Sequence, residues 1–171
     1  MHAKKRQPNP SSIFFNKVSV STAITQTEEQ LVEPEVIVPE RAIVYCEGHF
    51  GEVGGQPTHD LLRHSDQYEI ISVIDDENAG KDSGKVLNGE PNKIPVFRNL
   101  GTALAQAGRV PAHFIYGIDP ESGVLADIER RQLLRAIGYG MNIACGLHES
   151  LNADPEFAEA AAKAGVVIQD I

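Results

Sequence analysis

The sequence of 171 residues has no tryptophan, only two cysteines and no long apolar run. It contains no Cys-x-x-Cys pair and no Cys/His cluster with zinc-ligand spacing, so no metal site is expected. We therefore predict that Cys46 and Cys145 are buried, reduced thiols. No segment approaches the roughly 20 apolar residues of a membrane helix, which makes a cytoplasmic protein without membrane contact the expectation.

Basic side chains are also few, and the formal net charge is −9. Nucleic acids and anionic membranes attract proteins through clustered lysine and arginine, so we expect neither as a partner. A small anionic ligand held by backbone amides is compatible with this charge. The apolar fraction of 42 % is normal for a globular domain, and the length allows one such domain plus a tail.

The first 40 residues differ in composition from the rest. Residues 1–27 carry four Lys and Arg side chains and no acid, whereas glutamates dominate after Thr27. This composition predicts a flexible extension over residues 1–40. The apolar Ile13–Phe15 lies close to basic residues, so a targeting or docking peptide that binds a partner is the alternative.

From Arg41 onward, apolar runs typical of buried parallel strands alternate with helical segments. The runs predict six strands, over residues 42–46, 68–74, 94–97, 113–118, 141–145 and 166–168. Helical patterns and caps predict four helices, over residues 57–64, 99–107, 125–137 and 155–164. Because right-handed crossovers close such a chain, we predict one α/β domain over residues 41–171, a Rossmann-like, doubly wound, mostly parallel sheet. Pro95 makes the third strand short or peripheral.

The first predicted strand leads into a glycine-rich turn and then a helix, the place where ligands bind in doubly wound sheets. Amides at the start of that helix can hold a phosphate or carboxylate. Asp75 ends the second strand, where a dinucleotide site places its ribose-binding acid. The spacing is wider than G-x-G-x-x-G, so NAD(P) is one option rather than an assignment. The candidate cofactor-binding residues are Gly48, His49, Gly51, Gly54, Gly55, Thr58, Asp75 and His148.

Two of these candidates are histidines with more than one interpretation. His49 lies inside the glycine-rich turn, and either contacts ligand or is a solvated loop side chain. His148 and Glu149 follow the fifth strand at the same sheet edge, where they could perform acid–base chemistry or simply lie on the surface. The sequence contains no nucleophile motif, and the catalytic residues are left unassigned.

Residues 80–85, Gly-Lys-Asp-Ser-Gly-Lys, are similar to a phosphate-binding loop. The glycines are one residue too close, Lys85 is followed by Val86, and no helix is predicted after them. We therefore predict a mobile surface loop.

Several short motifs carry a family resemblance. In chain order they are Arg41–Gly51, Ser65–Glu69, Val73–Asp75, Ala79–Gly84, Ile94–Val96, Gly146–Glu149 and Asp154–Glu156. Together they resemble the N-terminal Rossmann-like domain of a family of unknown function, some of whose members are D-glutamate N-acetyltransferases. The resemblance implies functional positions at Glu47, Gly48, Gly51, Thr58, Asp75, Gly80, Gly84 and His148, and it adds acetyl-CoA to the candidate ligands.

In that family a larger P-loop domain follows, and this chain is similar only to the first domain. We therefore expect a stand-alone Rossmann-like module that binds a nucleotide-type or small anionic ligand and acts with a separate P-loop subunit. One alternative is a non-catalytic structural or docking protein that uses its N-terminal extension. Another is the front half of a split enzyme. A homo-oligomer is compatible with each.

Overall fold

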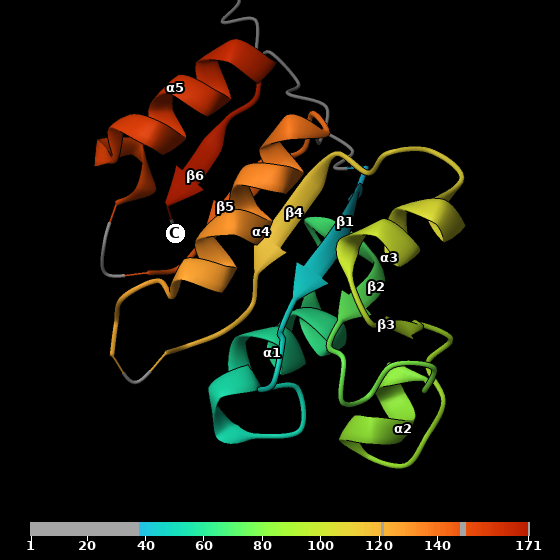
Figure 1. Ribbon diagram of the computed structural model, residues 1–171. Helices are drawn as coiled ribbons and strands as arrows, with labels where there is room; N and C mark the ends of the chain where they lie inside the picture. The colour runs from blue at the N-terminus through green and yellow to red at the C-terminus, as the bar shows by residue number, and fades with distance from the viewer. Residues whose placement is uncertain (1–37, 121, 148–149, 171) are drawn as a thin grey trace, which may run out of the picture. The chain divides into compact units, whose positions relative to one another are not determined.

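The computed structural model describes residues 38–120, 122–147 and 150–170. Six strands form one sheet in the order β3-β2-β1-β4-β5-β6, and every neighbouring pair is parallel (Figure 1). The strands are β1 (Glu40–Tyr45), β2 (Tyr68–Ile74), β3 (Val96–Phe97), β4 (His113–Tyr116), β5 (Asn142–Cys145) and β6 (Ile168–Asp170). The chain runs outward from β1 to β3, crosses back to β4 and runs outward again, which confirms the predicted Rossmann-like, doubly wound fold.

Helices cover the two faces of this sheet unequally. One face carries α1 (Gln56–His64), and the other carries α3 (Leu100–Ala107), α4 (Asp127–Gly138) and α5 (Pro155–Ala164) (Figure 1). This division follows from right-handed crossovers. The chain crosses the sheet in one direction from β1 to β2 and in the opposite direction from β4 to β5, so the connecting helices lie on opposite faces. The larger hydrophobic core accordingly lies on the α3–α5 side, and a smaller core lies under α1.

The central strands are apolar at successive positions because both of their faces are buried. In β1, Ile43 and Tyr45 enter the larger core, whereas Ala42 and Val44 enter the smaller one. All four are nearly inaccessible to solvent. The continuous apolar run in the sequence therefore reflects a central strand whose sheet is covered by helices on both faces.

The peripheral strands differ most from the sequence-based boundaries. β3 is a two-residue edge strand directly after Pro95, as the missing N–H of proline predicted. β6 was predicted over residues 166–168 but comprises Ile168–Asp170. Its register is set by β5, since Ile143 faces Ile168, and pairing with a neighbouring strand cannot be read from a local apolar pattern.

Helix α5 begins where its capping residues indicate. The Asp154 side chain accepts a hydrogen bond from the Glu156 amide (2.9 Å), and Pro155 occupies the first helical position. Arg130 of α4 reaches both carboxylates, at 2.7 Å from Asp154 and 2.7 Å from Glu156. Its guanidinium also lies over the Phe157 ring, so one side chain joins α4 to α5.

The predicted surface loop around residues 80–85 is wrong in one respect, because a short helix, α2 (Ser83–Leu87), begins inside it. The Asp82 carboxylate caps this helix and accepts bonds from the amides of Asn92 (3.0 Å), Lys85 (3.2 Å) and Lys93 (2.7 Å). These bonds lower the pKa of Asp82. The bond to Lys85 is a local helix cap, whereas the bonds to Asn92 and Lys93 join Asp82 to a segment about ten residues later. The short helix was missed because the segment was compared only with a phosphate-binding loop.

Two predictions concern residues that the structure leaves undescribed. Residues 1–37, which include most of the proposed extension and Ile13–Phe15, lie outside the described ranges, as do His148 and Glu149. In the ranges that are described, no helix combines the length and apolarity needed to cross a membrane.

Candidate functional site

The strand order reverses between β1 and β4, and the loops that follow these two strands lie side by side at the carboxyl edge of the sheet. We call residues 46–55 the β1 loop and residues 117–126 the β4 loop. Crossovers leave β1 and β4 in opposite directions, so no helix fills the space between the two loops. This is the position at which doubly wound folds bind ligands.

The β1 loop is built from successive tight turns. The amide of His49 donates to the Cys46 carbonyl (3.1 Å), that of Glu52 to His49 (2.9 Å) and that of Gly55 to Glu52 (3.2 Å). The last turn is a 3₁₀ helix, η1 (Val53–Gly55), which runs directly into α1. Gly48 has a φ of +71°, a left-handed conformation that favours glycine.

Asp75 braces this loop from the end of β2. Its side chain is fully buried, one oxygen accepts the Gly48 amide (2.9 Å), and the other accepts the Asn78 side-chain amide (2.6 Å). Glu47 in turn accepts the Asp76 amide (3.2 Å), and burial raises the pKa of Glu47. Asp75 therefore joins the loops after β1 and β2, and its carboxylate is already satisfied inside the protein.

Thr58 and Gly55 hold the start of α1 against the sheet. The Thr58 hydroxyl, fully buried, donates to the Gly117 carbonyl at the end of β4 (2.7 Å). A Cβ on Gly117 would collide with that hydroxyl, and one on Gly55 would collide with the His49 carbonyl. The thiol of the buried Cys46 also lies against the Gly117 carbonyl, at 3.7 Å, and burial raises the pKa of this thiol to about 12. These residues shape the site from beneath rather than facing its opening.

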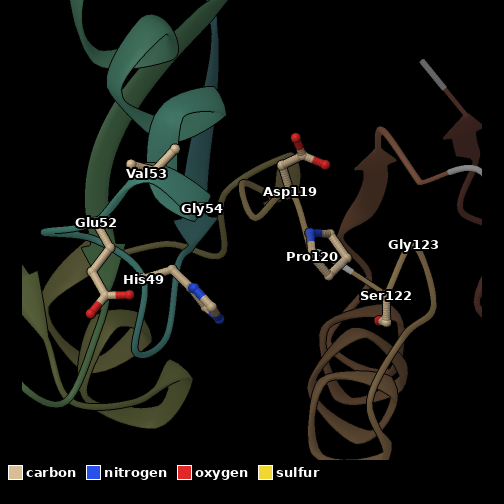
Figure 2. Close-up of a pocket in the computed structure, with 8 residues that line it drawn as sticks. All are labelled: His49, Glu52, Val53, Gly54, Asp119, Pro120, Ser122 and Gly123. Carbon is tan, nitrogen blue, oxygen red and sulfur yellow. The ribbon is translucent and has the colours of Figure 1, made fainter.

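An open pocket of about 790 Å³ separates the β1 and β4 loops (Figure 2). Its lining residues are His49, Glu52, Val53, Gly54, Asp119, Pro120, Ser122 and Gly123. The Asp119 amide donates to the Gly54 carbonyl (2.9 Å) and ties the loops together at this point. The imidazole of His49 extends from the β1 loop toward Pro120 and Ser122 of the β4 loop (Figure 2).

Side-chain charge in this pocket is of one sign. Glu52 and Asp119 carry carboxylates, and both are exposed. None of the described lining residues is a lysine or arginine. The remaining polar groups are the His49 ring, the Ser122 hydroxyl and the backbone of the two glycines. Such a set can accept hydrogen bonds from hydroxyl or amine groups and can pack small apolar surfaces against Val53 and Pro120.

Beneath the β4 loop, on the α4 face, two tyrosines lie next to a glutamate. The rings of Tyr45 and Tyr116 are stacked, 6.2 Å between centroids, and Glu129 is the nearby carboxylate. Burial first, and then Glu129, raise the pKa of Tyr116, and burial also raises that of Tyr45. Glu129 accepts the Ala126 amide (2.7 Å) at the start of α4, so a side chain that interrupts an apolar stripe has a capping role.

The structure separates the predicted binding residues into distinct groups. His49 and Gly54 line the pocket. Gly48 and Gly51 are exposed on the β1 loop, whereas Gly55, Thr58 and Asp75 are buried. His148 is outside the described residues. Their roles in ligand binding stay a prediction.

The sequence analysis missed the residues contributed by the β4 loop, above all Asp119, Pro120 and Ser122. A signal was present, because Gly117-Ile-Asp-Pro-Glu-Ser-Gly is a turn-rich segment directly after an apolar strand. Its importance depends on β4 lying next to β1. Among the described residues, no group of three or more His, Cys, Asp or Glu side chains could hold a metal ion.

Residues 76–171, more than half of the chain, match a family described as a Rossmann-like domain of unknown function, DUF1611_N. The chain belongs to this family. The match covers β3 to β6 and the whole β4 loop, and its description as Rossmann-like agrees with the parallel sheet of this structure. It confirms the resemblance found in the sequence motifs.

Two solved structures of longer proteins are similar to this chain. A DUF1611 family protein from Anabaena variabilis is 25 % identical, with a TM-score of 0.68, over 78 % of this chain and 36 % of that protein. The homoserine dehydrogenase of S. aureus is 7 % identical, with a TM-score of 0.44, over 78 % and 33 % of the two chains. This chain thus spans about a third of the length of either protein. No curated protein matches it.

Proposed function

We propose that this domain binds a nucleotide-type ligand in the pocket between the β1 and β4 loops. The observation that carries the proposal is the position of the pocket, at the reversal of strand order and lined from both sides of it. Its size is in the range of small-molecule sites, and it combines apolar surface with a few polar groups. NAD(H), NADP(H), acetyl-CoA and ATP are the ligands to test first.

A thermal-shift panel of these ligands tests the proposal. A ligand at 100 times its Kd stabilises the folded state by about 2.7 kcal/mol, which raises Tm by several degrees. Absence of any shift across the panel at millimolar ligand would overturn the proposal.

Gly54→Ala locates the site. A Cβ on Gly54 would lie 2.8 Å from His49 Nδ1, so the imidazole must move from its place in the pocket. We expect ligand affinity to fall about tenfold, with little loss of stability because the colliding atom belongs to a movable side chain. Gly138→Ala is the matched control, since a Cβ there meets nothing within 4 Å. Equal affinities of the two variants would place the ligand elsewhere.

The same proposal includes a second polypeptide that carries a P-loop. The observation that supports it is that the pocket is open, so a second polypeptide could contact a ligand bound there. Co-expression with the product of a neighbouring reading frame that encodes a P-loop, followed by co-purification, is the test. A partner that is lost on deleting residues 1–40, in a protein that binds no ligand, would instead favour the docking function.

A further inference from the structure

Three backbone amides that a phosphate could use, in the β1 loop and at the start of α1, are already bonded inside this protein. The Gly48 amide donates to the Asp75 carboxylate, the Gly55 amide to the Glu52 carbonyl, and the Gln56 amide to the Val53 carbonyl. Pro57, the next residue, has no N–H. A phosphate held by these three amides would have to displace bonds that shape the β1 loop.

The charge of the pocket also opposes a phosphate. Glu52 and Asp119 contribute two carboxylates, and the described lining residues contribute no lysine or arginine. A di- or triphosphate would bring several more negative charges into a partly desolvated space. Without a cation to compensate, each added phosphate is expected to weaken binding or leave it unchanged.

The groups that do line the pocket suit the other part of a nucleotide. Val53 and Pro120 offer apolar surface to a heteroaromatic ring, and the two glycines allow its close approach. The Glu52 and Asp119 carboxylates can accept hydrogen bonds from ribose hydroxyls, and His49 and Ser122 add groups that both donate and accept. We infer that the pocket recognises the nucleoside moiety, with the phosphates directed outward toward solvent or a second polypeptide. This inference rests on the proposed function and refines it.

Calorimetric titration of the full chain with adenosine, AMP, ADP and ATP, and with the guanosine series, tests this inference separately from the proposed function. We expect the nucleoside to bind as tightly as its triphosphate, within about threefold, and added salt not to weaken either. A Kd that falls about tenfold or more from nucleoside to triphosphate would overturn the inference while leaving the proposed function intact. So would competition by pyrophosphate alone. If no nucleoside, nucleotide or panel ligand binds, the proposed function itself fails.

Glu52→Gln combined with Asp119→Asn tests the role assigned to the carboxylates. Both side chains are exposed, so the fold should be unaffected. We expect nucleoside binding to weaken about tenfold and triphosphate binding to weaken less or to strengthen, because repulsion is removed. Glu159→Gln with Asp66→Asn, which changes the net charge equally at exposed positions outside the pocket, is the control. Parallel loss of nucleoside and triphosphate binding in the pocket variant, or the same response in the control, would contradict the inference.

Discussion

The two loops that form the candidate site are held in different ways. The β1 loop is fastened to the end of β2 by three bonds, from the Cys46 amide to the Ile74 carbonyl, from the Gly48 amide to Asp75 and from the Asp76 amide to Glu47. In the β4 loop, Gly117 is bonded to Tyr45 and Thr58 where β4 ends. The described residues after Gly117 have one long-range bond, from the Asp119 amide to the Gly54 carbonyl, and are otherwise closed by local turns such as that between Ser122 and Val124. The site therefore combines a rigid half with a half that can adapt, and regions with few long-range bonds open most easily.

The largest effect should come from removing the brace of the β1 loop. Asp75→Ala leaves the Gly48 amide and the Asn78 side chain without their buried acceptor, and we expect a loss of about 3 kcal/mol in the free energy of unfolding. Urea denaturation measures it. Asp76→Ala is the comparison, because the Asp76 pair with Arg98 is exposed and should contribute under about 1 kcal/mol. Similar losses in both variants would show that the β1 loop is not braced as described.

A smaller effect is expected inside the β1 loop itself. Gly55→Ala forces a Cβ against the His49 backbone, which cannot move independently, and should cost roughly 2 kcal/mol. Gly51→Ala, four residues earlier, meets nothing within 4 Å and should change stability by less than about 0.5 kcal/mol. Thermal unfolding of the two variants measures both effects. Equal losses of stability would show that the β1 loop is not packed more tightly at Gly55 than at Gly51.

The smallest change in stability, within about 0.5 kcal/mol, is expected for Ser122→Cys in the β4 loop, where the side chain is exposed. This variant allows the accessibility of the β4 loop to be measured by thiol labelling. The introduced thiol should react readily near neutral pH and faster as pH rises toward its ordinary pKa of about 8.5. Cys46 is buried under the β1 loop with its pKa raised to about 12, so its thiolate is scarce below that pH. If Cys46 were labelled about as fast as the introduced thiol, the two loops would not differ in rigidity as described.

The part of the predicted site that depends on a local signal is the β1 loop. The glycines after the first strand identified the β1 loop, and His49 and Gly54 do line the pocket. Asp75 was expected to face a ribose, but it is buried and bonded to Gly48, because a carboxylate at a strand end can serve a ligand or a neighbouring loop equally well. The β4 loop was missed because its residues matter only through their proximity to the β1 loop.

The sequence by itself determined the alternation of buried strands and helices, the start of α5 at Asp154 and Pro155, and the glycine-rich turn after β1. These features depend on groups within a few residues of one another, so they can be read locally. Only the tertiary structure decided that β4 pairs with β1, that Asp75 occupies the Gly48 amide, and that Asp119 and Pro120 complete the pocket. Each of these contacts joins segments distant in the chain, and strand pairing with its burial of apolar surface, rather than local preference, brings them together.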